Sequence, residues 1–309
     1  MKVSIVIPVY YNEDNLMPLY EDIKEKFIDR IDYDYEIVMV DDGSKDNSFS
    51  VIKSLKEQDD NIIPVKLSRN FGSHSAILCG LSQATGDCAI VKMADLQEPT
   101  EMMHDMVASW RKGNNVVLAV RDGREEAKSR ELFANLYYNM VRKVALPEMP
   151  QGGFDVFLLD RKVITVLENL DEKNSSICAQ ILWSGFKTDK VYYTRLAREI
   201  GTSKWTLKKK IKLVEDTLFG FTNLPILVVL VVGLIAVIAA LIWAIIFFAW
   251  RLMGNIPVAG WTTLIIVNLL SFGIIMMTLG VLGEYLWRTF DASRNRPTYI
   301  IEERDDEKH

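Results

Sequence analysis

A long uncharged stretch near the end of the chain constrains its architecture more than any other feature. Between Thr217 and Gly283 the only charged residue is Arg251, which separates two apolar runs, Leu224–Trp250 and Leu252–Gly283. A helix of about 20 apolar residues crosses the hydrocarbon core of a bilayer, so each run is long enough to span a membrane. Helices in soluble cores rarely run this far without a polar face. The sequence therefore predicts a C-terminal hairpin of two transmembrane helices.

Basic residues cluster on the outer sides of the two apolar runs. They are Lys204, Lys208, Lys209, Lys210 and Lys212 before the first run, and Arg288, Arg294 and Arg296 after the second. The excess of Lys and Arg in cytoplasmic segments predicts that both termini face the cytoplasm. We therefore expect a multi-pass protein of the cell (inner or plasma) membrane with its soluble part in the cytoplasm.

Residues 205–223 combine lysines and apolar residues at helical spacing just before the first run. This pattern predicts an amphipathic helix on the membrane surface, with its lysines facing anionic headgroups; a solvated charge run is the alternative. The expected organisation is a soluble domain over residues 1–204, this helix, two transmembrane helices over residues 224–287 and a cytoplasmic tail over residues 288–309.

The chain as a whole is mildly acidic. Its net charge is −5 and its pI is about 5.4, which argues against nucleic acid as a main partner. The three cysteines show no Cys-x-x-Cys spacing and the three histidines do not cluster, which argues against a structural zinc site.

Residues 1–120 alternate between strand-like and helix-like patterns. The expected strands are Val3–Val9, Tyr35–Val40, Ile62–Leu67, Cys88–Met93 and Asn115–Val120, and the expected helices are Asn15–Phe27, Ser48–Lys56, Ser75–Ala84 and Pro99–Arg111. This alternation predicts an α/β fold with a mostly parallel, doubly wound (Rossmann-like) sheet. Ligands of such sheets bind beyond the carboxyl ends of the strands.

Three polar segments follow expected strands: residues 41–44 (DDGS), 68–72 (SRNFG) and 95–97 (DLQ). The sequence lacks both a GxGxxG loop and a GxxxxGKS loop, which disfavours a dehydrogenase and a P-loop enzyme. Without such a loop, a nucleotide diphosphate is usually bound through a divalent cation, and hard oxygen ligands suit Mg²⁺ or Mn²⁺. Asp95 and Gln97 predict part of such a site; capping of the next helix is the alternative role for Asp95.

Seven segments together carry a family resemblance. They are residues 4–16 (SIVIPVYYNEDNL), 40–44 (VDDGS), 67–72 (LSRNFG), 94–99 (ADLQEP), 153–161 (GFDVFLLDR), 198–205 (REIGTSKW) and, after the apolar runs, 296–299 (RPTY). In this order they resemble the motifs of family 2 glycosyltransferases with the GT-A fold. More narrowly, they are similar to the polyprenyl-phosphate glycosyltransferases, which act on dolichyl or undecaprenyl phosphate. The resemblance covers nearly the whole chain.

The resemblance implies roles for individual residues. Nucleotide-sugar binding is implied for Pro8, Tyr10, Glu13, Asp41, Asp42 and Asn70. Metal binding is implied for Asp95 and Gln97, and a catalytic role is implied for Asp95 and for Asp155, the latter as a base or orienting group near the sugar. Contacts with phosphate groups of the acceptor are implied for Arg121, Arg124, Arg130, Ser203 and Lys204.

Two positions depart from the family pattern. The metal motif, often Asp-Ala-Asp, reads Met93-Ala94-Asp95 here, so one carboxylate is absent. A segment usually written Asp-Phe-Arg reads Asp155-Val156-Phe157, which removes an arginine. The chain also lacks the Gln-x-x-Arg-Trp motif of processive polysaccharide synthases, which favours transfer of a single sugar.

The implied activity is inverting transfer of one sugar, glucose or an N-acetylhexosamine, from a UDP-sugar to undecaprenyl or another polyprenyl phosphate, with Mg²⁺ or Mn²⁺ as cofactor. A GDP-mannose donor, a glycolipid acceptor such as diacylglycerol, and a non-catalytic nucleotide-sugar sensor are the alternatives. The small residues Gly273 and Gly280 in the second run further predict close helix packing and a homo-oligomer.

Overall fold

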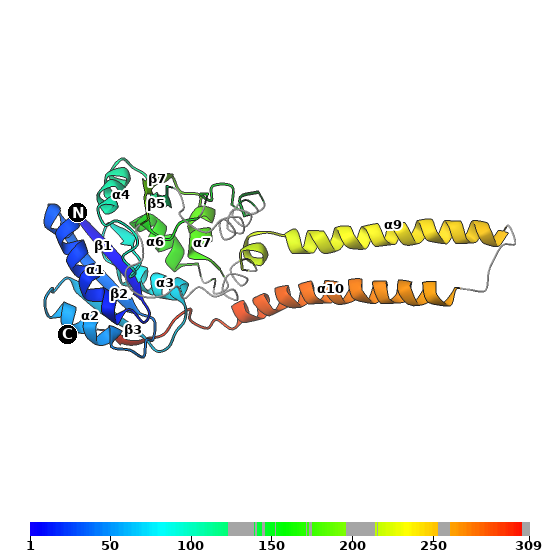
Figure 1. Cartoon of the computed structure of the whole chain (residues 1–309), viewed down its shortest axis with the longest axis horizontal. Helices are drawn as coiled ribbons and strands as arrows, with labels where there is room; N and C mark the ends of the chain where they lie inside the picture. Colours follow the sequence, from blue (N-terminus) through cyan, green and yellow to red (C-terminus); the bar gives the residue numbers. More distant parts are fainter. Residues whose placement is uncertain are drawn as a thin grey trace. The chain divides into compact units, whose positions relative to one another are not determined.

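The computed structural model describes residues 1–122, 139, 141–143, 146–151, 153–170, 172, 175–195, 214, 216–252 and 260–304. The chain forms two compact units (Figure 1). The first comprises Met1–Val214 together with Pro297–His309, and the second comprises Glu215–Arg296.

The first unit is built on an eight-stranded sheet. Its strands are β1 (Lys2–Val9), β2 (Asp34–Asp41), β3 (Ile62–Leu67), β4 (Cys88–Val91), β5 (Val116–Arg121), β6 (Phe157–Asp160), β7 (Thr188–Tyr193) and β8 (Ile301–Arg304). Its helices are α1 (Glu13–Lys26), η1 (Ile28–Arg30), α2 (Ser48–Lys56), α3 (Ser73–Gln83), α4 (Met102–Arg111), α6 (Arg161–Glu168) and α7 (Ile177–Trp183). The strand order is β7-β5-β6-β4-β1-β2-β3-β8.

The sheet is mostly parallel, as the alternating pattern predicts. The neighbours β4, β1, β2 and β3 run parallel to one another, and β7 is parallel to β5. Two strands run the other way: β6 pairs antiparallel with β4 and β5, and β8 pairs antiparallel with β3. Strand β6 has an apolar run of only three residues and β8 has a single apolar residue, Ile301, so neither shows a period from which the sequence could predict a strand.

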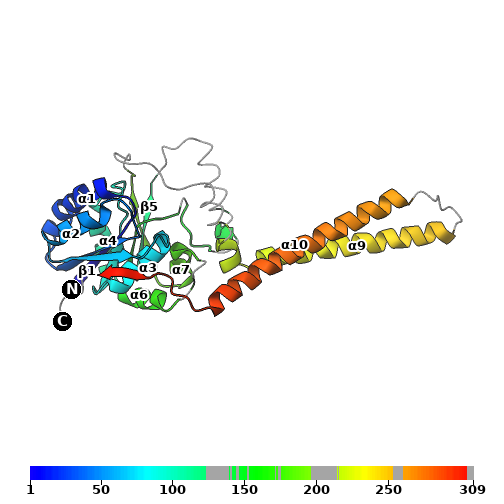
Figure 2. The ribbon, with the colours of Figure 1, turned by 90° about the horizontal axis from the view of Figure 1, so that it is seen from below.

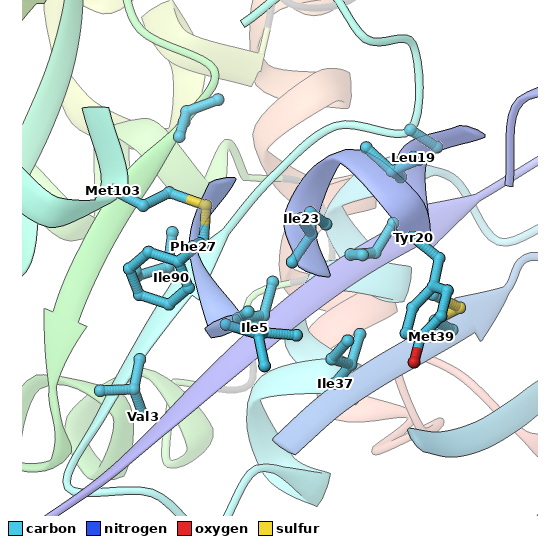
Figure 3. Packing of buried hydrophobic residues seen from close by; sticks show 14 of the residues in the cluster. Val3, Ile5, Leu19, Tyr20, Ile23, Phe27, Ile37, Met39, Ile90 and Met103 are labelled. Carbon is cyan, nitrogen blue, oxygen red and sulfur yellow. The ribbon is translucent and has the colours of Figure 1, made fainter. Parts of the chain in front are cut away.

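Residues of alternate parity on each strand face opposite sides of the sheet. On one side, Ile5, Ile37 and Ile90 pack with residues of α1, η1, α2 and α4, including Phe27 and Met103 (Figure 3). Each of these five side chains is fully buried. Burial of apolar surface on this scale is the main favourable contribution to folding of the unit.

The other side of the sheet is covered by α3 and α6, with α7 packed against α6 (Figure 2). Gly80 in α3 lies against Val6 of β1: a Cβ at this position would come within 2.3 Å of the Val6 Cγ1 atom. The glycine therefore allows α3 to approach the central strand closely, which positions the residues at the start of α3 above the carboxyl ends of the strands.

The C-terminal segment adds an edge strand to this unit. Strand β8 pairs with β3 at Val65↔Arg304 and Lys66↔Glu303, and the backbone N–H of Ser68 donates to Ile300 O at 3.0 Å. Residues 288–309 are expected from the sequence to form a tail, whereas in the structure residues 301–304 belong to the sheet. Pairing of β8 satisfies backbone groups that an open β3 edge would expose.

The second unit consists mainly of two long apolar helices, α9 (Leu224–Leu252) and α10 (Trp261–Ser293), which run in opposite directions (Figure 1). Segments of both, Leu224–Trp243 and Leu270–Ser293, are long and apolar enough to cross a membrane. At one end of the unit, Arg288 forms ion pairs with Asp216 (2.9 Å) and Glu284 (2.8 Å). These contacts fix the helical residues 216–221 onto the C-terminal part of α10.

Candidate functional site

The candidate site lies where the parallel strands β4, β1, β2 and β3 end. In register, Val9 lies beside Asp41, and Asp41 lies beside Lys66. The segments that follow these strands are therefore neighbours in space although they are distant in sequence. This edge is the position at which doubly wound sheets bind their ligands.

The segment after β1 is held by hydrogen bonds to the segment after β2. The N–H of Tyr11, whose φ is 54°, donates to Ser44 Oγ at 2.9 Å, and the Glu13 carboxylate accepts the N–H of Asn47 at 2.7 Å. The Tyr10 ring packs edge-on against the Tyr11 ring, with the centroids 4.6 Å apart. These contacts present Tyr10, which is only partly buried, at the mouth of the site.

Asp42 connects the β2 end to the β3 end. One carboxylate oxygen accepts the N–H of Phe71 at 2.7 Å, and the other accepts the N–H of Gly72 at 2.9 Å. The side chain is 2% exposed. Asp42 therefore orders the Asn-Phe-Gly turn that precedes α3, a structural role that the sequence-based assignment to nucleotide binding does not include.

Asp41 is fully buried beside Asp42. Its carboxylate accepts the N–H of Ser44 at 3.3 Å, and burial raises its pKa above the ordinary value despite this hydrogen bond. Asp41 thus supports the turn rather than offering an exposed ligand. Asn70, by contrast, is exposed at the same edge, and Pro8 is partly buried near the end of β1.

The segment after β4 forms a sharp turn. Leu96 adopts φ 55°, a left-handed conformation that L-residues with bulky side chains rarely adopt. The turn is closed by a weak hydrogen bond of 3.4 Å from the N–H of Gln97 to Asp95 Oδ1. Backbone strain of this kind concentrates at functional sites, where the surrounding structure maintains it.

The side chains of Asp95 and Gln97 converge on one cation, Arg195. Its Nη2 atom donates to Gln97 Oε1 at 2.6 Å and lies 4.0 Å from Asp95 Oδ2. Arg195 follows β7 by two residues, so the parallel pairing of β7 with β5 carries it to this edge. The sequence assigned no role to Arg195, because its position beside Asp95 depends on a strand that the sequence did not predict.

Behind this turn lies a buried pair of ionisable side chains, Lys92 and Glu98. Lys92 is fully buried and its Nζ donates to Glu98 O at 2.8 Å. Burial, and secondly the nearby Asp95, raise the pKa of the Glu98 carboxyl to about 7, whereas burial lowers the pKa of Lys92. This hydrogen bond from the Lys92 side chain to the Glu98 backbone connects the two ends of the turn. Neither residue shows a sequence signal beyond its place beside the metal motif.

Asp155 lies on the segment before β6 and forms an ion pair with Arg121 at the end of β5. Arg121 also donates from Nε to the Tyr193 hydroxyl at 3.3 Å. The Asp155 side chain is 49% exposed, whereas that of Arg121 is 13% exposed. Arg121, predicted to contact an acceptor phosphate, therefore holds Asp155 in place in this structure.

Four predicted phosphate-binding residues lie outside the described residues: Arg124, Arg130, Ser203 and Lys204. The remaining predicted residues lie at or just beyond the carboxyl ends of β1, β2, β3, β4 and β5, or just before β6. The fold thus brings together residues from sequence positions as far apart as Tyr10 and Asp155.

The residues at the β4 turn fit a divalent cation. Asp95 supplies a carboxylate and Gln97 an amide oxygen, both hard donors of the kind that Mg²⁺ and Mn²⁺ prefer. The fit is supported by geometry, because both oxygens already converge on one positive group, the Arg195 guanidinium. Among the described residues no group of three or more His, Cys, Asp or Glu side chains forms a metal site. A cation here would therefore need further ligands from substrate or water.

Comparison with known proteins gives one consistent family. Residues 4–167 match the model of the family described as "Glycosyl transferase family 2". An uncharacterized glycosyltransferase of Bacillus subtilis is 34% identical, covering 98% of this chain and 94% of that protein. A bactoprenol glucosyl transferase of Shigella phage SfV is 34% identical, covering 97% of this chain and 98% of that protein. A prophage bactoprenol glucosyl transferase homolog of Escherichia coli is also 34% identical over 97% of this chain.

Among solved structures, mannosyl-3-phosphoglycerate synthase from Rubrobacter xylanophilus has a similar fold. The TM-score is 0.50 at 17% sequence identity, and the match covers 70% of this chain and 71% of that one. This likeness concerns the fold alone. It agrees with the mostly parallel α/β sheet of the first unit.

Proposed function

Because the chain belongs to glycosyl transferase family 2, we propose that it transfers a single sugar, glucose, from UDP-glucose to a polyprenyl phosphate of the bactoprenol type. The observation that carries the choice of acceptor and sugar is the near full-length similarity to bactoprenol glucosyl transferases. This similarity extends beyond the family match at residues 4–167 and therefore includes the apolar helices α9 and α10.

The donor binds at the carboxyl ends of the strands in this proposal. Tyr10 is partly buried just after β1, where its ring would contact the flat base in this proposal, and Asn70 is exposed in the segment that follows β3. Asp42 and Asp41 act by fixing the surrounding turns, since their oxygens are occupied by backbone N–H groups. The diphosphate then lies toward Asp95 and Gln97.

The reaction is a displacement at the anomeric carbon of the sugar. An oxygen of the lipid phosphate attacks this carbon, the bond to the nucleoside diphosphate breaks, and its electron pair leaves with the diphosphate; the configuration inverts. The attacking oxygen is already anionic near neutral pH, so a strong general base is unnecessary. Asp155, held by Arg121, orients the sugar or the acceptor, and Asp95 with Gln97 holds the divalent cation. When bound, Mg²⁺ or Mn²⁺ supplies positive charge that stabilises the leaving diphosphate.

The apolar helices anchor the enzyme in the membrane that contains its acceptor. Both α9 and α10 contain a segment long enough to span a bilayer. Anchoring restricts the active site to the layer where the phosphate headgroups lie, which reduces the entropy lost when the two substrates meet. Three basic residues and one hydroxyl-bearing residue, Arg124, Arg130, Lys204 and Ser203, remain predicted contacts of the acceptor phosphate, and both termini are predicted to be cytoplasmic.

One assay tests this proposal. Purified full-length protein is incubated with undecaprenyl phosphate, Mn²⁺ and radiolabelled UDP-glucose, UDP-N-acetylglucosamine or GDP-mannose in parallel, and label is extracted with the lipid. We expect lipid-linked label from UDP-glucose. Label that appears only from GDP-mannose, only with diacylglycerol as acceptor, or with no combination of donor and acceptor would contradict the proposal.

A second measurement tests the acceptor contacts. Neutralisation of Arg130 or Lys204 should raise KM for undecaprenyl phosphate more than KM for UDP-glucose. Equal effects on both values, or an effect on the donor alone, would remove these residues from the acceptor site.

A further inference from the structure

The cation beside the metal motif has no assigned role. Arg195 lies beyond β7, outside every sequence motif that indicated the site, yet its Nη2 atom contacts Gln97 at 2.6 Å and approaches Asp95 to 4.0 Å. Its side chain is 28% exposed, so the group is reached by solvent and by ligands. An arginine at this place is close enough to the metal motif to contact a diphosphate that binds there.

Arg195 has hydrogen-bonding capacity that the protein does not use. A guanidinium carries five N–H donors in a planar fork. Its Nε–H is buried and has no hydrogen-bond partner within the part of the chain that the structure describes. A buried donor without a partner destabilises the protein and is expected to be satisfied when the proper ligand binds.

The charges around Arg195 explain its position without ligand. The Asp95 carboxylate lies 4.0 Å from the Arg195 guanidinium, and Glu98, three residues further along the chain, is a buried carboxyl. At the first position of the motif stands Met93, which cannot bind a cation through oxygen. Arg195 therefore neutralises the single remaining carboxylate of the motif.

A divalent cation at Asp95 and Gln97 would compete with Arg195 for the same oxygens. Two positive groups cannot both be held by one carboxylate and one amide oxygen at short range without repulsion. The bond from Arg195 to Gln97 must then be given up, and a guanidinium next to the cation is left to bind an anion. Paired phosphate oxygens match its fork geometry.

We propose that Arg195 is a diphosphate-binding residue of the donor site: it occupies the Asp95 and Gln97 oxygens while the site is empty, and it binds the diphosphate once a divalent cation takes those oxygens. Arg195 thus supplies positive charge to the leaving group at a metal motif that has lost one carboxylate. The inference rests on the proposed function for the identity of the donor, but the binding it describes requires no acceptor.

Full-length wild-type protein is compared with R195Q, which removes the charge, and R195K, which keeps the charge but loses the fork. R111Q is the matched control, because Arg111 is an exposed arginine of the same unit that contacts only the Tyr33 ring and Met1 among its described partners. Mn²⁺ binding without nucleotide is measured from the electron paramagnetic resonance signal of free Mn²⁺. UDP binding is measured by calorimetry with and without Mn²⁺.

In R195Q we expect Mn²⁺ affinity equal to or above that of the wild type, because a competing cation is gone. UDP affinity in the presence of Mn²⁺ should fall about 10- to 100-fold, the usual effect of one charge-assisted contact. R195K should show a smaller loss, and R111Q should show none.

UDP affinity of R195Q within twofold of the wild type would overturn the inference. A parallel loss of Mn²⁺ and UDP affinity that lysine does not reduce would also overturn it, since it would indicate a purely structural role. Neither binding measurement uses undecaprenyl phosphate, so the two proposals can fail independently. A wild type that binds UDP through Arg195 but transfers glucose to no polyprenyl phosphate would refute the proposed acceptor. It would not contradict the proposed role of Arg195.

Discussion

The hydroxyl groups of Ser82 and Tyr299 lie 2.8 Å apart, although 217 positions separate the two residues in the sequence. Ser82 belongs to α3, and Tyr299 precedes β8. The contact attaches the segment that follows the apolar helices to the C-terminal end of α3, the helix that begins at the candidate site. Ion pairs of Lys53 with Glu303 and of Lys66 with Glu302 reinforce the attachment from β8 itself.

Loss of this hydrogen bond should weaken the first unit. We expect Tyr299→Phe to lower the free energy of unfolding by about 1 kcal/mol, because one hydrogen bond is lost in a partly buried position while Ser82 keeps its bond to Cys79 O. Tyr192→Phe is the control, since the Tyr192 side chain is 64% exposed. Chemical unfolding followed by fluorescence measures both.

Deletion of residues 297–309 should lower the free energy of unfolding considerably more than Tyr299→Phe does, because β3 then becomes an open edge strand. Equal stability of the wild type and this deletion would show that β8 does not support the sheet.

The Asp95 carboxylate should be required for cation binding. We expect Asp95→Asn to reduce Mn²⁺ binding below detection and to lower the transfer rate roughly 100-fold or more, because a charged hard ligand of the cation is removed. Circular dichroism should be unchanged, since the contacts of the Asp95 side chain with the backbone of Gln97 (3.4 Å) and with Arg195 (4.0 Å) are both long. Asp105→Asn on the exposed face of α4 is the control. Transfer at a normal rate by Asp95→Asn in EDTA would exclude the metal role.

Gly43 should not tolerate a side chain. Its φ is +67°, and a Cβ there would lie 2.4 Å from the carbonyl carbon of Arg69 and 2.7 Å from the N atom of Asn70. Gly43→Ala should therefore separate the β2 and β3 ends and destabilise the unit by roughly 2–4 kcal/mol. Gly113→Ala isolates the conformational part of the effect, because Gly113 has φ +86° with no atom within 4 Å of the added Cβ. It should cost only about 1–2 kcal/mol. Similar losses in both variants would indicate that the two loops are free to move apart.

The stability of the protein should fall in mild acid because of His74. Both ring nitrogens are buried, and burial lowers the pKa of His74 to about 4. An unfolded histidine has a pKa of about 6.5, so between pH 6.5 and pH 4 the unfolded chain takes up a proton that the folded chain does not. Stability is therefore lost as the pH falls through this window, by up to about 1.4 kcal/mol per pH unit.

His74→Gln removes this titration. The variant should gain stability relative to the wild type at pH 5, whereas the difference between the two proteins should stay constant from pH 7 to pH 8. Urea unfolding at each pH measures the difference. A wild type that is destabilised no more than the variant between pH 7 and pH 5 would contradict the assignment.

Local sequence patterns determined the main elements of the first unit because each pattern depends on neighbouring residues alone. Alternating apolar runs identified β1, β2, β3 and β5 to within one or two residues, and helical spacing identified α2 as Ser48–Lys56 without error. The absence of charge identified α9 and α10, since hydropathy is a property of composition. Polar residues directly after strands marked Asp42, Asp95 and Gln97 as members of one site.

Only the tertiary structure decided which side chains meet. Three contacts of the site depend on strand order. They are the bond of Asp42 to the turn before α3, the ion pair of Arg121 with Asp155, and the contact of Arg195 with Gln97. Strand order is set by pairing and packing between segments far apart in the sequence, which no local pattern records. The short strands β6 and β8 illustrate this limit: each is a strand because a neighbour supplies hydrogen-bond partners, and in isolation its four residues carry too little information to specify one.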